Sequence, residues 1–319
     1  MFTRIAVLGA GTMGYGFAVD FARYVPEVRL VDVSEAMLQR GLDNIAISLQ
    51  VLLEHGLTTE EEAERVRANI HPFTDLEKAV AGADMVIEAL PEVLEIKHAV
   101  LAKADAVAPE NTVFVCNSSS LRLSDVFSVL SPGRRSRSLM AHYFNPPEIM
   151  PLVELLSLPE TDEAVMEAMR TFYFSIDKIP VRIKKEVAGL SANRIQMAVW
   201  REILWQLENG VADKEDLDMV LTYGPALRWA TTGVITMMDM TGLDIIRNIS
   251  LNLTKELSCE AGSPPQLTRL VEENKLGLKT GQGYFSYPEG ERAGVKEAYV
   301  RRLAKQLACS RSNIAARKS

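Results

Sequence analysis

The stretch R-I-A-V-L-G-A-G-T-M-G, residues 4 to 14, decides the fold of this chain. Its first five residues form a short apolar run that is typical of a buried strand, and glycine ends the run at once. Gly9, Gly11 and Gly14 then give the spacing G-x-G-x-x-G. In that spacing the first glycine permits a tight turn, the second lets backbone N–H groups approach a pyrophosphate, and the third lets a helix pack on the strand. The stretch therefore predicts a strand, a glycine-rich turn and a helix that together bind a dinucleotide.

The next strand predicts which dinucleotide is bound. The run V-R-L-V-D-V, residues 28 to 33, follows the predicted helix, and Asp32 near its end can bind both hydroxyls of an adenosine ribose. The same carboxylate would repel a 2′-phosphate, and residues 33 to 35 supply no cation for one. We therefore predict NAD rather than NADP, bound by Gly9, Gly11, Thr12, Met13, Gly14 and Asp32. The alternative is a glycine-rich turn in a protein that binds FAD or no nucleotide.

The pattern along the chain changes near residues 184 to 186. Before that point helices alternate with further strand candidates at residues 85–90, 112–116, 138–143, 152–156 and 179–183. Such alternation is typical of an α/β fold with a mainly parallel, doubly wound sheet of the Rossmann type. After that point the pattern predicts helices alone. We therefore predict an NAD-binding domain over residues 1–185 and an all-helical C-terminal domain over residues 186–319.

Composition favours work on a small molecule in the cytoplasm. The net charge of −7 offers no basic field for nucleic acid or an anionic membrane, and no apolar run reaches membrane-spanning length. The three cysteines are odd in number and far apart, which argues against a disulfide framework and a zinc site, so no metal is predicted. The first strand begins almost at Met1, which leaves no room for a signal peptide.

Several later segments, taken together and in this order, resemble the L-3-hydroxyacyl-CoA dehydrogenase family. They are E-A-L-P-E (88 to 92) with Lys97, N-S-S-S-L (117 to 121), H-Y-F-N-P-P-E-I-M-P-L-V-E (142 to 154), K-E-V-A-G-L-S-A-N-R (185 to 194) and E-N-K-L-G-L-K-T-G-Q-G-Y-F-S-Y (273 to 287). The resemblance covers residues 3 to 288. It implies an NAD-dependent oxidoreductase that oxidises a 3-hydroxy group to a 3-oxo group, a place in fatty acid metabolism, and a homodimer formed by the helical domain.

The resemblance also implies roles for single residues. His142 corresponds to the general base, Glu154 to the acid that pairs with it, and Ser119 and Asn193 to the residues that hold the reacting oxygen of the substrate. Glu92, Lys97 and Asn117 correspond to residues around the nicotinamide ribose.

The residue types agree with that chemistry. Oxidation of a secondary alcohol needs a base of near-neutral pKa, which an imidazole supplies, and a carboxylate on the other ring nitrogen fixes its tautomer. The alternatives are a strand-end histidine bonded to backbone, serines at 118 to 120 that cap a helix beginning near Ser124, and a buried Asn193 amide. The 3-hydroxyisobutyrate type of dehydrogenase is disfavoured, because it needs a lysine where Met197 stands.

Two departures from the family bear on the substrate. Members that use CoA tend to carry lysines after the second strand, whereas residues 34 to 75 contain none, although arginines there could supply a cation. The segment Y-G-P-A-L-R-W-A-T-T-G, residues 223 to 233, resembles L-gulonate 3-dehydrogenase (λ-crystallin), carnitine 3-dehydrogenase and a pyridine-carboxylate aldehyde dehydrogenase. There Arg228 could clamp a substrate carboxylate and Trp229 could form a pocket wall. Their alternatives are an ion pair within the same domain for Arg228 and a core position for Trp229.

The substrate class therefore stays open at this level. It is either a hydroxyacyl-CoA or a small free hydroxy acid, and an aldehyde or alcohol of a pyridine carboxylate is a further alternative. The alternative from a different class is a λ-crystallin-like protein that binds NAD but has a mainly structural role.

Overall fold

The computed structural model of the protein describes residues 2–316 and divides into two compact units. The first unit combines the residues up to Ser191 with the stretch from Tyr299 onward. The second unit comprises Ala192–Ala298.

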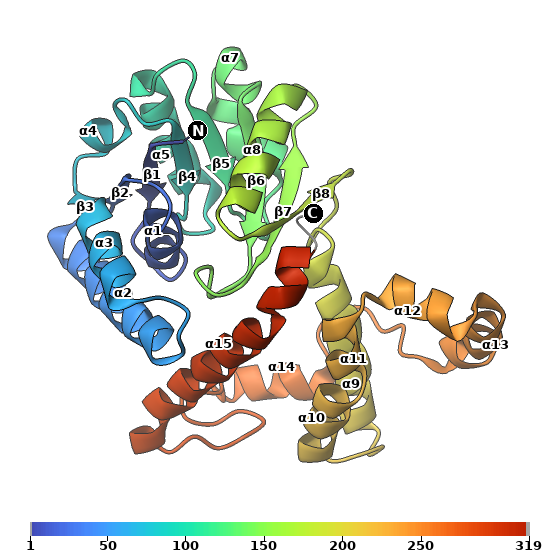
Figure 1. The fold of residues 1–319 in the computed structure, drawn as a ribbon. Helices are drawn as coiled ribbons and strands as arrows, with labels where there is room; N and C mark the ends of the chain where they lie inside the picture. Colours follow the sequence, from blue (N-terminus) through green and yellow to red (C-terminus); the bar gives the residue numbers. More distant parts are fainter. Residues whose placement is uncertain (1, 317–319) are drawn as a thin grey trace. The chain divides into compact units, whose positions relative to one another are not determined.

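The first unit is built on one eight-stranded sheet in the order β3-β2-β1-β4-β5-β6-β7-β8 (Figure 1). Every neighbouring pair is parallel except β6 and β7, which are antiparallel. The predicted α/β class with a doubly wound sheet is confirmed. The strands are β1 Arg4–Leu8, β2 Glu27–Val31, β3 Ile70–Phe73, β4 Met85–Glu88, β5 Val113–Cys116, β6 Ser138–Tyr143, β7 Leu152–Ser157 and β8 Ile179–Ile183.

Helices cover both faces of this sheet. Because side chains alternate along a strand, Ile5 and Val7 of β1 pack in one apolar cluster while Ala6 and Leu8 pack in the other. The first cluster contains residues of α1, α2, α3 and α8, together with Ala304 of α15; the second contains residues of α4, α5 and α6. The helices of this unit are α1 Gly14–Ala22, α2 Glu35–Glu54, α3 Glu60–Asn69, α4 Leu76–Val80, α5 Leu94–Val107, α6 Leu123–Val126, η1 Phe127–Val129, α7 Pro132–Arg135 and α8 Glu163–Ser175.

Two features of the sheet were not predicted. The edge strand β3 contains exposed His71 and Pro72, so it lacks the apolar pattern of a buried strand; proline is tolerated there because an edge strand needs fewer ladder hydrogen bonds. The antiparallel pairing of β6 with β7 follows from the short connection between Tyr143 and Leu152. A parallel return would need a crossover of a dozen residues or more, as estimated from general sheet geometry.

The second unit is helical. No strand occurs among its described residues, apart from isolated bridges around Gln282. The prediction of helices alone is thus confirmed for this unit. The elements are α9 Ala192–Glu208, α10 Lys214–Tyr223, α11 Pro225–Thr231, α12 Val234–Thr241, α13 Leu243–Leu253, η2 Thr254–Glu256, α14 Pro265–Glu272, η3 Glu289–Glu291 and α15 Arg292–Ala316, which ends in the first unit.

Within the described residues, no helix combines the length and the apolar character needed to cross a membrane.

Candidate active site

The glycine-rich turn after β1 leaves no space for side chains at two of its three glycines. Gly9 has a φ of +106°, and a Cβ atom there would lie 2.6 Å from the carbonyl oxygen of Ala89. A Cβ atom at Gly14 would lie 1.7 Å from the carbonyl oxygen of Gly9, so only glycine lets α1 begin this close to the strand. At Gly11 a Cβ atom would meet no atom within 4 Å. The backbone at Gly11 is therefore open to a ligand, as a pyrophosphate site requires.

A cavity of about 1060 Å³ opens beside this turn at the carboxyl ends of the strands. In an open parallel sheet, this edge is where ligands bind. Of the cofactor-binding residues predicted in this unit, only Gly14 is absent from its lining. The lining includes Gly9, Gly11, Thr12, Met13, Asp32, Glu92, Lys97 and Asn117, together with Ser119.

Asp32 stands where the second strand ends. Its Oδ2 accepts a hydrogen bond from the backbone N–H of Ala10 at 2.8 Å, and its Oδ1 accepts one from the N–H of Val33 at 2.7 Å. These bonds fix the carboxylate at the rim of the cavity, and each oxygen retains a lone pair for a ribose hydroxyl. The residues present therefore fit the adenosine ribose of NAD.

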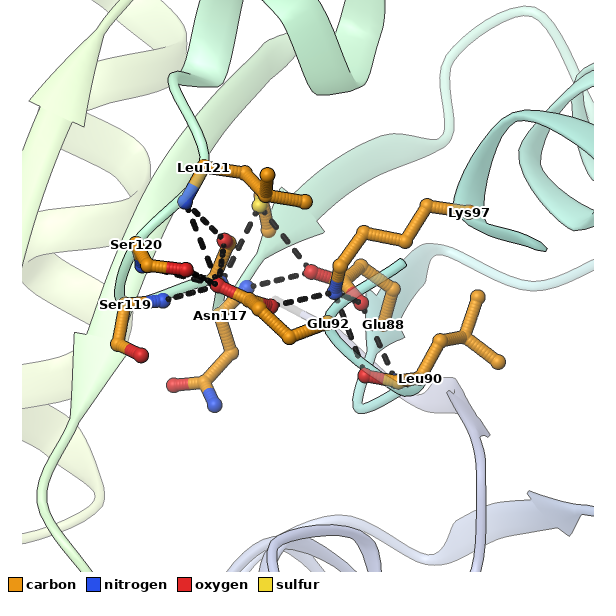
Figure 2. A network of polar contacts seen from close by, with 10 residues as sticks. Glu88, Leu90, Glu92, Lys97, Asn117, Ser119, Ser120 and Leu121 are labelled. Atoms are coloured by element: carbon orange, nitrogen blue, oxygen red, sulfur yellow. Dashed lines mark hydrogen bonds and ion pairs between the residues drawn. The ribbon is translucent and has the colours of Figure 1, made fainter. Parts of the chain in front are cut away.

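An ion network around Lys97 forms part of the cavity lining, and Figure 2 shows its contacts. Nζ of Lys97, which is 1% exposed, donates to Oε2 of Glu88 at 2.6 Å and to the carbonyl oxygen of Leu90 at 3.3 Å. The same Nζ lies 3.3 Å from Oε2 of Glu92. Burial by itself would lower the pKa of Lys97, but Glu88 and Glu92 outweigh burial and raise it. Lys97 is thus a charged residue that forms ion pairs with two carboxylates.

Glu92 organises the loop that follows β5. Its Oε1 accepts hydrogen bonds from the hydroxyls of Ser118 and Ser120 and from the backbone N–H groups of Ser119, Ser120 and Leu121 (Figure 2). Burial alone would raise the pKa of this carboxyl, but these bonds and Lys97 lower it to about 2. The serines therefore bind a carboxylate rather than cap α6, which has no side-chain cap.

Glu88 is the centre of the network, and the sequence pattern gave it no role. It is fully buried, and its Oε1 accepts from the thiol of Cys116 and the N–H of Asn117, both at 3.1 Å. The signal that could have found it is an acidic residue that ends the apolar run of β4. Burial and the charge of Glu88 raise the pKa of the Cys116 thiol, so this cysteine is a neutral donor and not a nucleophile.

His142 and Glu154 are hydrogen-bonded to each other. Nδ1 of His142 lies 3.0 Å from Oε2 of Glu154, and the two side chains are 4% and 1% exposed. The antiparallel pairing of β6 with β7 sets these residues directly opposite each other, on the same face of the sheet. The second oxygen of Glu154 accepts from the N–H of Ser191 at 2.9 Å. With Nδ1 directed at the carboxylate, Nε2 is the ring nitrogen that can accept a proton.

Asn117 links the base strand to the cavity. Its Oδ1 accepts from the backbone N–H of Tyr143, the neighbour of His142, at 2.9 Å. In Figure 2 the Asn117 amide points away from the carboxylate network. This hydrogen bond therefore extends the β5–β6 pairing and joins the cavity wall to the strand that carries His142.

The remaining predicted residues belong to the second unit. Asn193 is half-buried in the first turn of α9. Arg228 and Trp229 lie on α11, where Arg228 is exposed and makes no ion pair with any other described residue. Trp229 is 36% exposed, so within this unit it is not a core residue.

Two family models cover most of the chain. The one described as 3-hydroxyacyl-CoA dehydrogenase, NAD binding domain, matches residues 4–187, and the one described as its C-terminal domain matches residues 189–287.

Similar proteins act on different substrates. The chain is 30% identical to 5-formyl-3-hydroxy-2-methylpyridine 4-carboxylate 5-dehydrogenase of Mesorhizobium japonicum, over 95% of this chain and 96% of the relative. It is 31% identical to the mitochondrial hydroxyacyl-coenzyme A dehydrogenase of Homo sapiens, over 89% of this chain and 91% of the relative. It is 33% identical to L-carnitine dehydrogenase of Streptomyces griseus, over 75% of this chain and 70% of the relative.

The fold is also close to that of a solved structure. The crystal structure of a 5-formyl-3-hydroxy-2-methylpyridine 4-carboxylic acid 5-dehydrogenase, described as an NAD⁺-dependent dismutase, superimposes with a TM-score of 0.88 at 30% identity. The match covers 98% of each chain.

Proposed function

Since the chain belongs to the 3-hydroxyacyl-CoA dehydrogenase family and is an NAD-dependent oxidoreductase acting on CH–OH groups, we propose that it oxidises a small free hydroxy acid. The reaction converts a 3-hydroxy group to a 3-oxo group. The observation that carries the proposal is the buried hydrogen bond between His142 and Glu154, which prepares an imidazole to accept a proton.

Each site residue has a role in the proposed reaction. Nε2 of His142 takes the proton of the substrate hydroxyl, and Glu154 keeps the ring in the required tautomer and stabilises the imidazolium that forms. Ser119 and Asn193 hold the reacting oxygen by hydrogen bonds. NAD, when bound, accepts the hydride. The glycine-rich turn and Asp32 bind its adenosine diphosphate part, and Glu92, Lys97 and Asn117 surround its nicotinamide ribose.

The charge of the helices after β2 supports a substrate without CoA. Residues 34 to 75 contain no lysine, and α3 begins with Glu60, Glu61 and Glu62. The guanidinium of Arg65 lies 3.9 Å from Glu62 and 3.4 Å from the carbonyl oxygen of Arg23, so its charge is partly compensated. A CoA phosphate would find little attraction there.

The second unit supplies groups suited to a carboxylate. Arg228 can bind a carboxylate through two parallel hydrogen bonds, and Trp229 can form an apolar wall beside it. Two relatives, by their names, act on a pyridine carboxylate and on carnitine. The second candidate substrate is a hydroxyacyl-CoA, which the name of the human relative supports. A role in fatty acid metabolism would follow only if the substrate is a hydroxyacyl-CoA.

A panel of substrates tests the proposal. NADH absorbance is followed with L-gulonate, carnitine, 3-hydroxybutyrate, a pyridine carboxylate bearing an alcohol or aldehyde, and 3-hydroxybutyryl-CoA. We expect kcat/KM for one of the free acids to exceed that for the CoA thioester by at least about tenfold, the usual effect of one well-placed charged contact. Turnover of the thioester alone would overturn the proposed substrate. No turnover of any compound, with NAD still bound, would instead indicate a λ-crystallin-like structural role.

We propose that the working form is a cytoplasmic homodimer joined through the helical residues 186–319, with residues 1–185 binding NAD. The second unit supports this because, among its described residues, Leu217 is the only buried apolar side chain. Large apolar side chains on its helices are exposed, including Ile235, Met240, Ile245 and Ile249. A second copy of the chain is the occupant that would cover them. The unpaired, widely separated cysteines support a reducing compartment.

A further inference from the structure

Lys178, between α8 and β8, is a buried charge outside the proposed site. It is 3% exposed, and its Nζ lies 2.8 Å from Oδ1 of Asp20, which is 2% exposed. The same Nζ donates to the carbonyl oxygens of Pro147 at 2.6 Å and Met150 at 3.2 Å. It also lies 5.5 Å from the ring centroid of Tyr143. Every N–H of this ammonium therefore has a partner, and two of the partners are backbone groups.

Those backbone groups belong to the loop of residues 144–151, which joins β6 to β7. His142 lies just before the loop and Glu154 just after it, in the paired strands that the loop connects. The conformation of the loop therefore acts together with the strand pairing on how these two side chains face each other. The loop is held at a second point, where the hydroxyl of Ser48 donates to Oε1 of Glu148 at 2.6 Å. Among these contacts, Lys178 is the one that binds the loop backbone itself.

Lys178 acts from the opposite side of the sheet. Tyr143 and Ala141 of β6 pack in the apolar cluster that contains α1, whereas Met140 packs in the other cluster. Since side chains alternate along a strand, His142 points to the side of Met140 and away from Lys178. Lys178 therefore does not touch the reacting groups.

A buried ion pair is by itself weak evidence for a role in stability. Apolar residues of similar volume can replace a buried pair without loss of stability, because desolvating two charges offsets much of their attraction. Burial raises the pKa of the Asp20 carboxyl, which Lys178 opposes. What an apolar pair could not do is donate to the carbonyl oxygens of Pro147 and Met150.

We propose that Lys178, held by Asp20, is a positioning residue that fixes the β6–β7 loop and thereby the hydrogen bond between His142 and Glu154. The inference rests on the proposed function, in which this bond orients the base.

Two variants test it in the full-length protein. Lys178→Met removes the donor and leaves Asp20 buried without its cation, whereas the double variant Asp20→Asn with Lys178→Met removes both charges. We expect both to lower kcat by roughly 10- to 100-fold, with KM for NAD within about twofold of the wild type, because a small misplacement of the base slows proton transfer without affecting the cofactor. We expect the Tm of the double variant to lie above that of Lys178→Met, because the double variant leaves no buried charge unpaired. A double variant with wild-type Tm and wild-type kcat would overturn the inference. If Lys178→Met does not fold, the double variant alone provides the test.

The matched control is Arg134→Met. Arg134 is 4% exposed, pairs with Asp105 at 2.8 Å and donates to the carbonyl oxygens of Thr112 at 2.6 Å and Ala108 at 3.1 Å. Like Lys178, Arg134 is a buried cation that donates hydrogen bonds to the backbone of a loop, but this loop joins α5 to β5. We expect Arg134→Met to lower Tm and leave kcat unchanged. An equal loss of kcat in this control and in Lys178→Met would show that the effect is general destabilisation and overturn the inference.

An NMR measurement separates this inference from the proposed function. With ¹⁵N-labelled histidine, the Nδ1–H resonance of His142 is assigned by its absence in His142→Gln. We expect this resonance to persist in the wild type and in Arg134→Met, and to shift or vanish in the double variant. If it is unchanged in the double variant, the positioning role is wrong whatever the substrate. If it shifts while no substrate is turned over by the wild type, the proposed function fails and the structural link stands.

Discussion

At the scale of single residues, the proposed chemistry depends on two carboxylates with different tasks. Glu154 binds a ring nitrogen of His142 and is almost fully buried. Glu92 binds a row of serine N–H and O–H groups, and its side chain is 35% exposed. The first carboxylate therefore orients a base, whereas the second shapes the loop that carries Ser119.

Replacing the base tests the first task. We predict that His142→Gln lowers kcat by roughly 10² to 10⁴, because glutamine keeps a polar side chain but cannot accept the hydroxyl proton. NAD affinity, measured by calorimetry, should stay close to that of the wild type, since the cavity beside the glycine-rich turn is unchanged. Turnover equal to that of the wild type would contradict the assignment.

The second task has a pH signature. Burial alone would raise the pKa of Glu92, but the hydrogen bonds and the charge of Lys97 lower it from the ordinary 4.5 to about 2, so they favour the ionised form in the folded protein. This contribution to the free energy of unfolding is complete above about pH 4.5 and is lost as the pH falls through about 2. We predict that Glu92→Gln is less stable than the wild type at neutral pH. The difference between their free energies of unfolding should become smaller as the pH falls from 4.5 to 2. Denaturant unfolding at several pH values measures this difference.

Glu95→Gln is the control for that prediction. Glu95 is exposed, lies in the first turn of α5 three residues after Glu92, and takes no part in the described bonds to the serine loop. For Glu95→Gln, we expect the difference in free energy of unfolding from the wild type to be independent of pH. An equally pH-independent difference for Glu92→Gln would contradict the prediction.

At the scale of elements, the contact between the glycine-rich turn and α1 is the tightest point of the cofactor site. We predict that Gly14→Ala destabilises the protein by at least about 2 kcal/mol and weakens NAD binding, because the new methyl group would overlap the carbonyl of Gly9. Thermal unfolding and NAD titration measure both effects.

Gly133→Ala is its control. Gly133 lies in α7, and a Cβ atom there would meet nothing within 4 Å. We expect this variant to be neutral or more stable by roughly 0.5 to 1 kcal/mol, as for alanine in place of a helical glycine. Similar losses in the two variants would show that the close approach at Gly14 is not the cause.

At the scale of the whole molecule, the apolar surface of the second unit predicts the assembly. Ile245 and Ile249 are four residues apart on α13, so they share one face, and they are 48% and 49% exposed. We predict that the double variant Ile245→Asp with Ile249→Asp is monomeric in light scattering after size exclusion, with its helix content retained in circular dichroism. Ile47→Asp, on α2 of the first unit where Ile47 is 63% exposed, should remain dimeric. A dimeric double variant would place the interface elsewhere.

The sequence by itself determined the class of sheet, the glycine-rich turn and the choice of NAD. These depend on residues that are close along the chain, where apolar periodicity and turn geometry act directly. The edge strand β3 was missed because its exposed His71 and Pro72 carry no apolar pattern.

Only the tertiary structure decided which partners the buried lysines have. The contacts of Lys97 with Glu88 and Glu92, and those of Lys178 with the β6–β7 loop, were not predicted. The family resemblance implied the pairing of His142 with Glu154, and the structure adds that the antiparallel pairing of β6 with β7 sets them opposite each other. Their partners depend on strand order and on the antiparallel turn of β7, which bring residues together regardless of their spacing in sequence. Residue type predicts that a buried charge needs a partner, but the packing of the sheet selects that partner.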